Sequence, residues 1–301
     1  MLNFLPPRIL GSIIFLLMLI NLLFWMFPVY ACILLKLVTW GRVRKEMSKW
    51  VAANSQTWAH CNVLIWDSCL RIEWDLRGIE DLDRNGQYMA ISNHQNWNDI
   101  LAQIKAFDGR APFFKFFMKQ ILIWVPVLGL AWWGLDFPFM KRHKPEQIAK
   151  NPDLRRQDIE TTRKACEKYR DMPVLVLNFL EGTRFTPEKH ARQDSPYKHL
   201  LRPKVGGLAF AINVMGEKVS TLLDITIVYP DGPCQFWDFI SGKLKRIVLE
   251  VREREIPREF FDADYAEDAE HRARVKAWVE QIWREKDQRM AELLAEANSA
   301  V

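Results

Sequence analysis

Residues 90–99 read Ala-Ile-Ser-Asn-His-Gln-Asn-Trp-Asn-Asp and join the end of an apolar run to the composition of a helix start. The run from Tyr88 to Ile91 is typical of a buried strand, and Asn96 is the expected N-cap of the helix that follows. His94 is therefore predicted to lie in a strand-to-helix turn. On one continuous helix, five residues would rotate Asp99 about 140° away from His94. With His94 in the turn, the Asp99 carboxylate can reach the imidazole, which predicts a general base and its orienting partner; a structural histidine beside a helix cap is the alternative.

A second apolar run, at residues 173–179, predicts a central strand of a parallel sheet, because such strands are buried on both faces. Glu181 follows this strand as His94 follows the first. Ligands of open α/β sheets bind at the carboxyl ends of the strands, so the two side chains are expected to share a site. Further strands are expected at 71–76, 222–229 and 246–251, and helices at 48–70, 99–107, 153–170 and 267–296. The pattern predicts an α/β fold, with a mixed, largely parallel sheet flanked by helices and an N-terminal membrane-embedded helical segment.

The N-terminal segment is almost unbroken apolar sequence from Ile9 to Leu35. Residues 9–27 match the roughly 20 apolar residues that cross a bilayer. Pro28 is expected to kink or end that helix, which leaves 29–40 as a shorter apolar helix. Residues 1–45 are therefore expected to form an anchor, either one span or a helical hairpin. Only Arg8 precedes the segment, whereas four basic residues lie between 42 and 49, which places the remainder of the chain in the cytoplasm.

Composition narrows the classes of partner. The 301 residues are 49% hydrophobic with 13 Trp, which suits both a large core and membrane contact. The net charge of +5 comes from basic residues mixed with acidic ones, which favours an anionic lipid surface over nucleic acid. Five scattered cysteines without a Cys-x-x-Cys pair indicate reduced thiols, and the histidines lack metal-ligand spacing, so no metal is expected.

Three motifs carry a resemblance to a known family. Asn93-His94 followed by Asp99 resembles the first motif of the glycerolipid acyltransferases, which include the 1-acylglycerol-3-phosphate acyltransferases. The run Asn-Phe-Leu-Glu-Gly-Thr-Arg at 178–184 is similar to that family's Glu-Gly-Thr-Arg motif, and 135–142 to its phosphate-contacting segment. The motifs occur in the family's order over about half of the chain. The likeness is greatest to a bacterial inner-membrane branch, which implies an inner-membrane protein with an acyltransferase domain at 46–301 that faces the cytoplasm and ends in an amphipathic helix.

The resemblance implies transfer of a fatty acyl group from an acyl-CoA or acyl-carrier-protein thioester to the free hydroxyl of a lysophospholipid, most simply lysophosphatidic acid. His94 and Asp99 would be catalytic, with no acyl-enzyme and no cofactor. The absence of a Gly-x-Ser-x-Gly sequence agrees with direct attack. The implied substrate contacts are Lys141, Arg142, Glu181, Gly182, Thr183 and Arg184. Arg184 offers a planar fork for a phosphate, and Glu181 would either orient Arg184 or hydrogen-bond the glycerol.

Several alternatives stay open. Met140-Lys141-Arg142 departs from the family's Ile-Asp-Arg, so either cation could contact phosphate, and Lys204 is expected in a structural turn rather than at the phosphate. The family's fourth motif is only loosely present at 222–230, which leaves lysophosphatidylglycerol or another lipid as the acceptor. A non-catalytic membrane lipid-binding scaffold is the rival of another class. The apolar stretch at 111–140 is either a core helix or a wall for an acyl chain.

Overall fold

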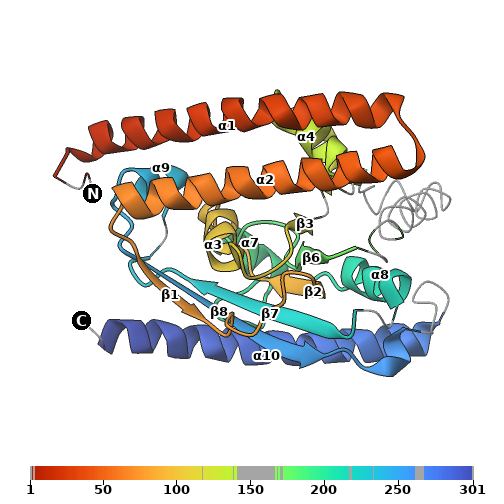
Figure 1. The fold of residues 1–301 in the computed structure, drawn as a ribbon. Coiled ribbons are helices and arrows are strands. Elements are labelled where there is room, and N and C mark those ends of the chain that lie inside the picture. The colour runs from red at the N-terminus through yellow and green to blue at the C-terminus, as the bar shows by residue number, and fades with distance from the viewer. Residues whose placement is uncertain are drawn as a thin grey trace.

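The core of the protein is a six-stranded sheet in the order β1-β8-β7-β2-β6-β3 (Figure 1). The computed structural model describes residues 2, 4–116, 118–137, 139–140, 167, 169, 172–216, 219–232, 234–261 and 268–299. The strands are β1 (Glu73–Arg77), β2 (Gln87–Ser92), β3 (Phe114–Phe116), β6 (Val174–Phe179), β7 (Thr221–Val228) and β8 (Arg246–Glu255). Every neighbouring pair is parallel except β7 with β8. The predicted mixed, largely parallel sheet is confirmed.

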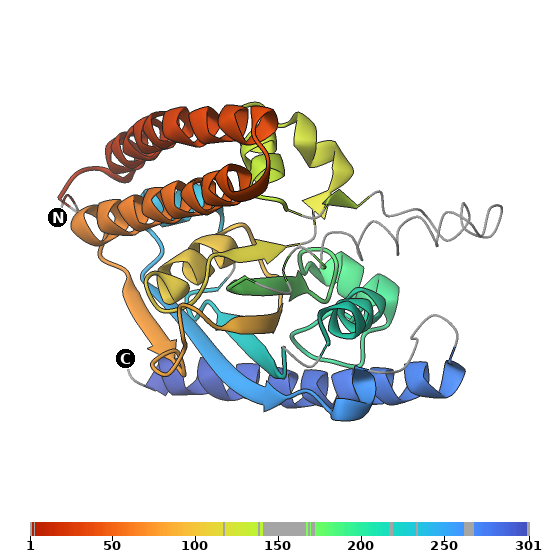
Figure 2. The same cartoon turned by 45° about the vertical axis from the view of Figure 1, so that its right-hand side comes forward.

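Helices cover both faces of this sheet (Figure 1, Figure 2). On one face lie α8 (Gly206–Met215) and α10 (Ala269–Ser299); on the other lie α2 (Gly41–Cys69), α3 (Asn98–Phe107) and α9 (Phe236–Ile240). Side chains alternate along a strand, so Met89 and Ile91 of β2 pack toward α8 and α10, while Ala90 packs toward α2 and α3. The neighbouring strands β2 and β6 are apolar on both faces for this reason. Because they are parallel, their carboxyl ends lie at the same edge of the sheet.

The N-terminal segment is a single helix, α1 (Pro7–Val38), with Pro28 in its interior. The helix therefore does not end at Pro28, and the expected separate helix at 29–40 is wrong. A proline removes one backbone hydrogen bond from a helix, but α1 buries Ile14 and Met26 before the proline and Val29 and Ile33 after it. Packing of these side chains before and after Pro28 keeps the helix continuous despite the missing hydrogen bond. The chain then reverses at residues 39–40 into α2, which begins ahead of the predicted 48, so the expected boundary at residue 45 falls within α2.

The second apolar stretch packs against the far end of α1 rather than forming one core helix. It contains a short 3₁₀ helix, η1 (Gln120–Trp124), and α4 (Leu128–Gly134), flanked by the paired strands β4 (Met118–Lys119) and β5 (Phe139–Met140). The buried Lys36 of α1 donates to the carbonyl of Gly134 at 3.0 Å and pairs with Asp136 at 2.6 Å. These contacts fix α4 beside α1, as Figure 1 shows. Apart from residues 167 and 169, the helix expected at 153–170 falls outside the residues described.

By length and composition, α1 could cross a membrane. One such helix near an N-terminus is weak grounds by itself, because signal sequences and buried core helices have the same composition. Its outward face nonetheless exposes large apolar side chains along most of its length, including Phe15, Leu19, Leu23, Phe24, Phe27 and Leu34.

Candidate active site

The predicted strand-to-helix turn exists and carries His94. β2 ends at Ser92, and α3 starts at Asn98 rather than directly after Asn96. Asn96 is not the N-cap; its side-chain oxygen instead accepts a hydrogen bond from the Asn98 backbone N–H at 2.7 Å. This small side-chain turn adds a residue before the helix. The prediction was wrong about the cap and right about the turn.

His94 and Asp99 are brought together as predicted, with Nδ1 and Oδ2 2.8 Å apart. A carboxylate only accepts hydrogen bonds, so Nδ1 carries the hydrogen and the Nε2 lone pair is left to accept a proton. No hydrogen bond reaches Nε2 from the part of the chain that the structure describes. Asp99 is fully buried, whereas the His94 side chain is 16% exposed. The arrangement is that of a general base held by a buried carboxylate and open on its outer edge.

Asp99 itself is held by donors from three other groups. Its Oδ2 accepts the backbone N–H groups of Gln95 at 2.6 Å and Asn96 at 3.0 Å, and its Oδ1 accepts the hydroxyl of Tyr229 at 2.7 Å. Burial, and then the nearby Asp99 charge, hold the pKa of Tyr229 well above its usual value, so this phenol stays a donor. Tyr229 lies 130 positions away, just past β7, and sequence reasoning missed it. A lone tyrosine after an apolar run gave no signal.

A ring stack and a pair of side-chain hydrogen bonds hold the His94 turn against the sheet. The His94 ring stacks on Phe179, the last residue of β6, with ring centroids 4.1 Å apart. The Asn93 side chain donates to the carbonyl of Ile227 at 2.8 Å and accepts its N–H at 2.9 Å, so it completes the ladder between β2 and β7. Asn93 is thus a structural member of the motif, and the neighbouring strands hold the imidazole on both sides.

Glu181 meets the turn from the end of β6, and of its two expected roles the contact with the glycerol stays a prediction. Its two oxygens accept the backbone N–H of His94 at 2.7 Å and of Leu201 at 3.0 Å. It is 1% exposed and is not paired with Arg184, so its expected orientation of that arginine is wrong. Burial raises the pKa of Glu181 to about 8, while the two N–H groups act in the opposite direction. Its place under the backbone makes it a brace for the His94 turn.

The rest of the 181–184 motif forms a tight, cation-rich turn. Gly182 has φ +66°, and a Cβ there would lie 3.0 Å from the Lys204 side chain, so glycine serves both the turn and this close packing. Lys189 donates to the Thr183 hydroxyl and to the Arg184 carbonyl, both at 2.8 Å. Lys204, expected only to shape a turn, lies against the motif itself.

The exposed guanidinium of Arg184 lies 5.0 Å from the centre of the Trp97 ring. Within the ranges described, it pairs with no carboxylate. Trp97 belongs to the His94 stretch, so this contact joins the two motifs at their surface. Lys141 and Arg142, the other predicted phosphate contacts, fall outside the residues described, and their roles stay predictions.

An open apolar pocket of about 410 Å³ adjoins this surface. It is lined by Trp97, Ile100 and Leu101 of the α3 region and by Phe236 of α9. Three of its lining residues belong to the stretch of chain that carries His94 and Asp99.

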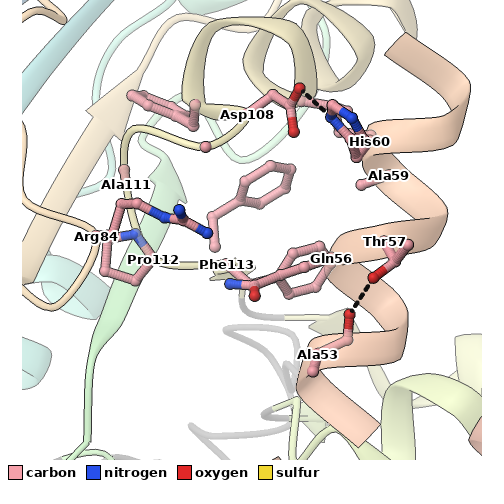
Figure 3. A pocket seen from close by; sticks show the side chains of 14 residues that line it. Ala53, Gln56, Thr57, Ala59, His60, Arg84, Asp108, Ala111, Pro112 and Phe113 are labelled. Atoms are coloured by element: carbon pink, nitrogen blue, oxygen red, sulfur yellow. Dashed lines mark hydrogen bonds and ion pairs between the residues drawn. The ribbon is translucent and has the colours of Figure 1, made fainter. Parts of the chain in front are cut away.

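A second cavity, of about 400 Å³, lies away from the dyad (Figure 3). It is bounded by α2, by the carboxyl end of α3 and by Arg84, which precedes β2, whereas His94 follows it. His60 and Asp108 pair across its rim at 2.8 Å. No group of three His, Cys, Asp or Glu side chains that could hold a metal occurs among the residues described.

The comparisons with known proteins agree with this geometry. The sequence model of the family described as Acyltransferase matches residues 73–229, or 157 of the 301 residues. The chain belongs to the acyltransferase family. The match runs from β1 to Tyr229, and so includes His94, Asp99 and the 181–184 motif.

Curated relatives and a solved structure extend the comparison. The 1-acyl-sn-glycerol-3-phosphate acyltransferases delta of Mus musculus and Homo sapiens are 29% identical over 184 residues, which cover 58% of this chain and 43% of theirs. The chain thus spans less than half the length of these relatives. An uncharacterised acyltransferase of Schizosaccharomyces pombe is 26% identical over 260 residues, 74% of this chain and 67% of its own. The chain also superposes on the crystal structure of the 1-acyl-sn-glycerophosphate (LPA) acyltransferase PlsC from Thermotoga maritima, with a TM-score of 0.56 at 16% identity. The superposition covers 95% of this chain and 98% of that one, which shows a shared fold.

Proposed function

We propose that this acyltransferase moves a fatty acyl group from a thioester of coenzyme A or acyl-carrier protein to the free hydroxyl of a lysophospholipid, most simply lysophosphatidic acid. The observation that carries the proposal is the His94–Asp99 pair, which leaves the imidazole Nε2 without a hydrogen bond from the residues described. The guanidinium of Arg184 lies over Trp97, in the same stretch of chain as the pair. Relatives named for 1-acylglycerol-3-phosphate support this choice of acceptor.

The chemistry needs one base and no covalent enzyme intermediate. The acceptor hydroxyl attacks the thioester carbonyl while Nε2 of His94 takes its proton, and Asp99 stabilises the imidazolium that forms. The tetrahedral intermediate expels the thiolate, which takes the proton back from His94. The products are the new ester and a free thiol. No cofactor enters this sequence of steps, since the thioester is itself a substrate.

Cations at the 181–184 motif suit the acceptor's phosphate. Arg184 presents a planar fork that matches two phosphate oxygens, and the Lys204 side chain lies beside Gly182 of the same turn. Lys189 supports the turn from behind through its bonds to Thr183 and to the Arg184 carbonyl. Lys141 and Arg142 are proposed as further phosphate contacts on sequence grounds alone.

We place the protein at a membrane, with α1 as its contact, in the bacterial inner membrane with the catalytic domain on the cytoplasmic side. The apolar face of α1 continues onto exposed Trp124, Leu130 and Trp133 of the η1 and α4 segment. Exposed apolar patches of this extent mark membrane or partner surfaces. A bilayer contact would give an acyl chain access to the apolar pocket beside Trp97.

The test is acyl transfer by the purified protein in nanodiscs, with acyl-CoA and acyl-carrier-protein donors in parallel. The acceptor panel contains lysophosphatidic acid, lysophosphatidylglycerol and a phosphate-free monoacylglycerol. We expect transfer to lysophosphatidic acid, its loss in His94→Ala at unchanged Tm, and selective loss with phosphorylated acceptors in Arg184→Ala. Transfer that persists in His94→Ala refutes the mechanism. A preference for lysophosphatidylglycerol changes the acceptor, and no transfer to any acceptor favours a lipid-binding scaffold.

A further inference from the structure

Helix α10 begins beyond the part of the chain that matches the acyltransferase family, yet it contacts the backbone that supports His94. It packs along the face of the sheet opposite α3 (Figure 1). Its Lys286 is buried and binds β7 through an ion pair with Asp224 at 2.5 Å and a hydrogen bond to Thr226 at 3.2 Å. This internal ion pair fixes α10 against the sheet, which makes the helix a rigid reference for whatever else it holds.

Two side chains of α10 hold the segment 198–201. Asp287 accepts the backbone N–H groups of Lys198 at 2.8 Å and His199 at 2.7 Å, one on each carboxylate oxygen. Trp283 donates its indole N–H to the carbonyl of Leu201 at 2.9 Å. Leu201 and Trp283 are both fully buried. The segment lies outside any helix or strand, so these bonds replace those of regular secondary structure.

The same segment then holds the catalytic turn. The N–H of Leu201 donates to one oxygen of Glu181 at 3.0 Å, and the other oxygen accepts the N–H of His94 at 2.7 Å. Glu181 is 1% exposed, so no solvent can replace either donor without opening the core. A displacement of Leu201 therefore moves the Glu181 carboxyl group, and with it the backbone of His94.

We infer that Asp287 and Trp283 are positioning residues for His94, acting through the 198–201 segment and Glu181. The kinetic consequence of this inference rests on the proposed function, whereas the contacts are independent of it. A misplaced imidazole slows proton transfer without changing the affinity for either substrate. The predicted signature is thus a fall in kcat at constant KM, since a misplacement of about 1 Å at a reacting group can cost about 10²-fold in rate.

The experiment compares Asp287→Ala, Asp287→Asn and Trp283→Phe in the full chain. Asparagine keeps one acceptor oxygen for two N–H donors, and phenylalanine keeps an aromatic ring without the N–H. The matched control is Leu293→Ala, which removes a buried side chain further along the same helix, about 9 Å from Asp287 and about 15 Å from Trp283. We expect Asp287→Ala to lower kcat about tenfold at unchanged KM, with Asp287→Asn in between, whereas Leu293→Ala lowers Tm and leaves kcat unchanged.

A second measurement does not depend on activity. Selective ¹⁵N-histidine labelling gives amide signals from the six histidines, with the His94 signal assigned through His94→Gln. We expect Asp287→Ala and Trp283→Phe to shift the His94 amide and Leu293→Ala to leave it in place. An unmoved His94 amide in both α10 variants overturns the inference, as does a loss of kcat in Leu293→Ala equal to that in Asp287→Ala. If the wild type transfers no acyl group to any acceptor, the proposed function fails while the amide shift still decides the positioning.

Discussion

Replacing Asp99 with asparagine isolates the contribution of its charge. Three donors converge on Oδ2, from His94, Gln95 and Asn96, and Tyr229 donates to Oδ1. An asparagine oxygen can take the Oδ2 position, and its NH₂ can then donate to the Tyr229 hydroxyl, which also accepts. The fold and the turn should therefore survive, and Tm should change little. What is lost is the negative charge that faces the imidazolium as it forms.

The size of the loss follows from the distance. Unit charges 2.8 Å apart attract by about 6 kcal/mol at an effective dielectric constant near 20, which is an upper bound for this half-open site. A lower figure for the same loss is the contribution of one hydrogen bond to a charged group, which is about 3 kcal/mol. At about 1.4 kcal/mol for each factor of ten, kcat should fall by about 10²- to 10⁴-fold.

The assay is single-turnover transfer of a labelled acyl group to lysophosphatidic acid, with Tm measured on the same preparation. Tyr229→Phe is the matched control, because it removes one donor from Asp99 and leaves the charge in place. It should cost far less than Asp99→Asn. A kcat for Asp99→Asn within threefold of wild type, at unchanged Tm, would refute the assignment of the dyad as base and orienter.

Two further changes test the surroundings of the dyad. Burial raises the pKa of Glu181 from 4.5 to about 8, so the folded state binds a proton that the unfolded state releases between these values, and stability falls as pH rises through this window. Glu181→Gln cannot titrate, so the difference in unfolding free energy between wild type and variant should change by roughly 3 kcal/mol from pH 5 to pH 8 in urea titrations; parallel pH curves contradict the shift. Leu101→Trp should narrow the apolar pocket of about 410 Å³ and lower kcat/KM for long acyl chains while sparing short ones. Varying the donor and acceptor chains separately shows which one uses the pocket, and an unchanged chain-length profile for both excludes it.

Sequence reasoning succeeded where the determining contacts are local. The turn between β2 and α3 follows from an apolar run and the polar residues just after it, and the distance between His94 and Asp99 follows from that turn. The sheet was predictable for a related reason, because apolar strands buried on both faces read as unbroken runs. Even Glu181 was placed at the correct edge, since parallel strands present their carboxyl ends together.

The failures share a physical cause, which is contact between residues far apart in the chain. Pro28 ought to interrupt α1 by its local chemistry, but burial of Met26 and Val29 against neighbouring elements outweighs the lost hydrogen bond. Asp99 has a distant hydrogen-bond partner in Tyr229, and Glu181 has one in Leu201. No rule of sequence spacing links either pair. A role for Glu181 in orienting Arg184 was a local inference, and the buried backbone donors overruled it.

The two buried carboxyl groups of the site show how surroundings assign different tasks to similar side chains. Asp99 accepts four hydrogen bonds, one of them from the imidazole, and lies where a positive charge forms during transfer. Glu181 accepts two, both from backbone N–H groups, and burial raises its pKa to about 8. Glu181 binds the backbone of the His94 turn rather than the imidazole, so it braces the turn while Asp99 contacts the ring. The imidazole thus meets the Asp99 carboxylate at Nδ1, and the cations of the 181–184 motif are proposed to meet the acceptor's phosphate.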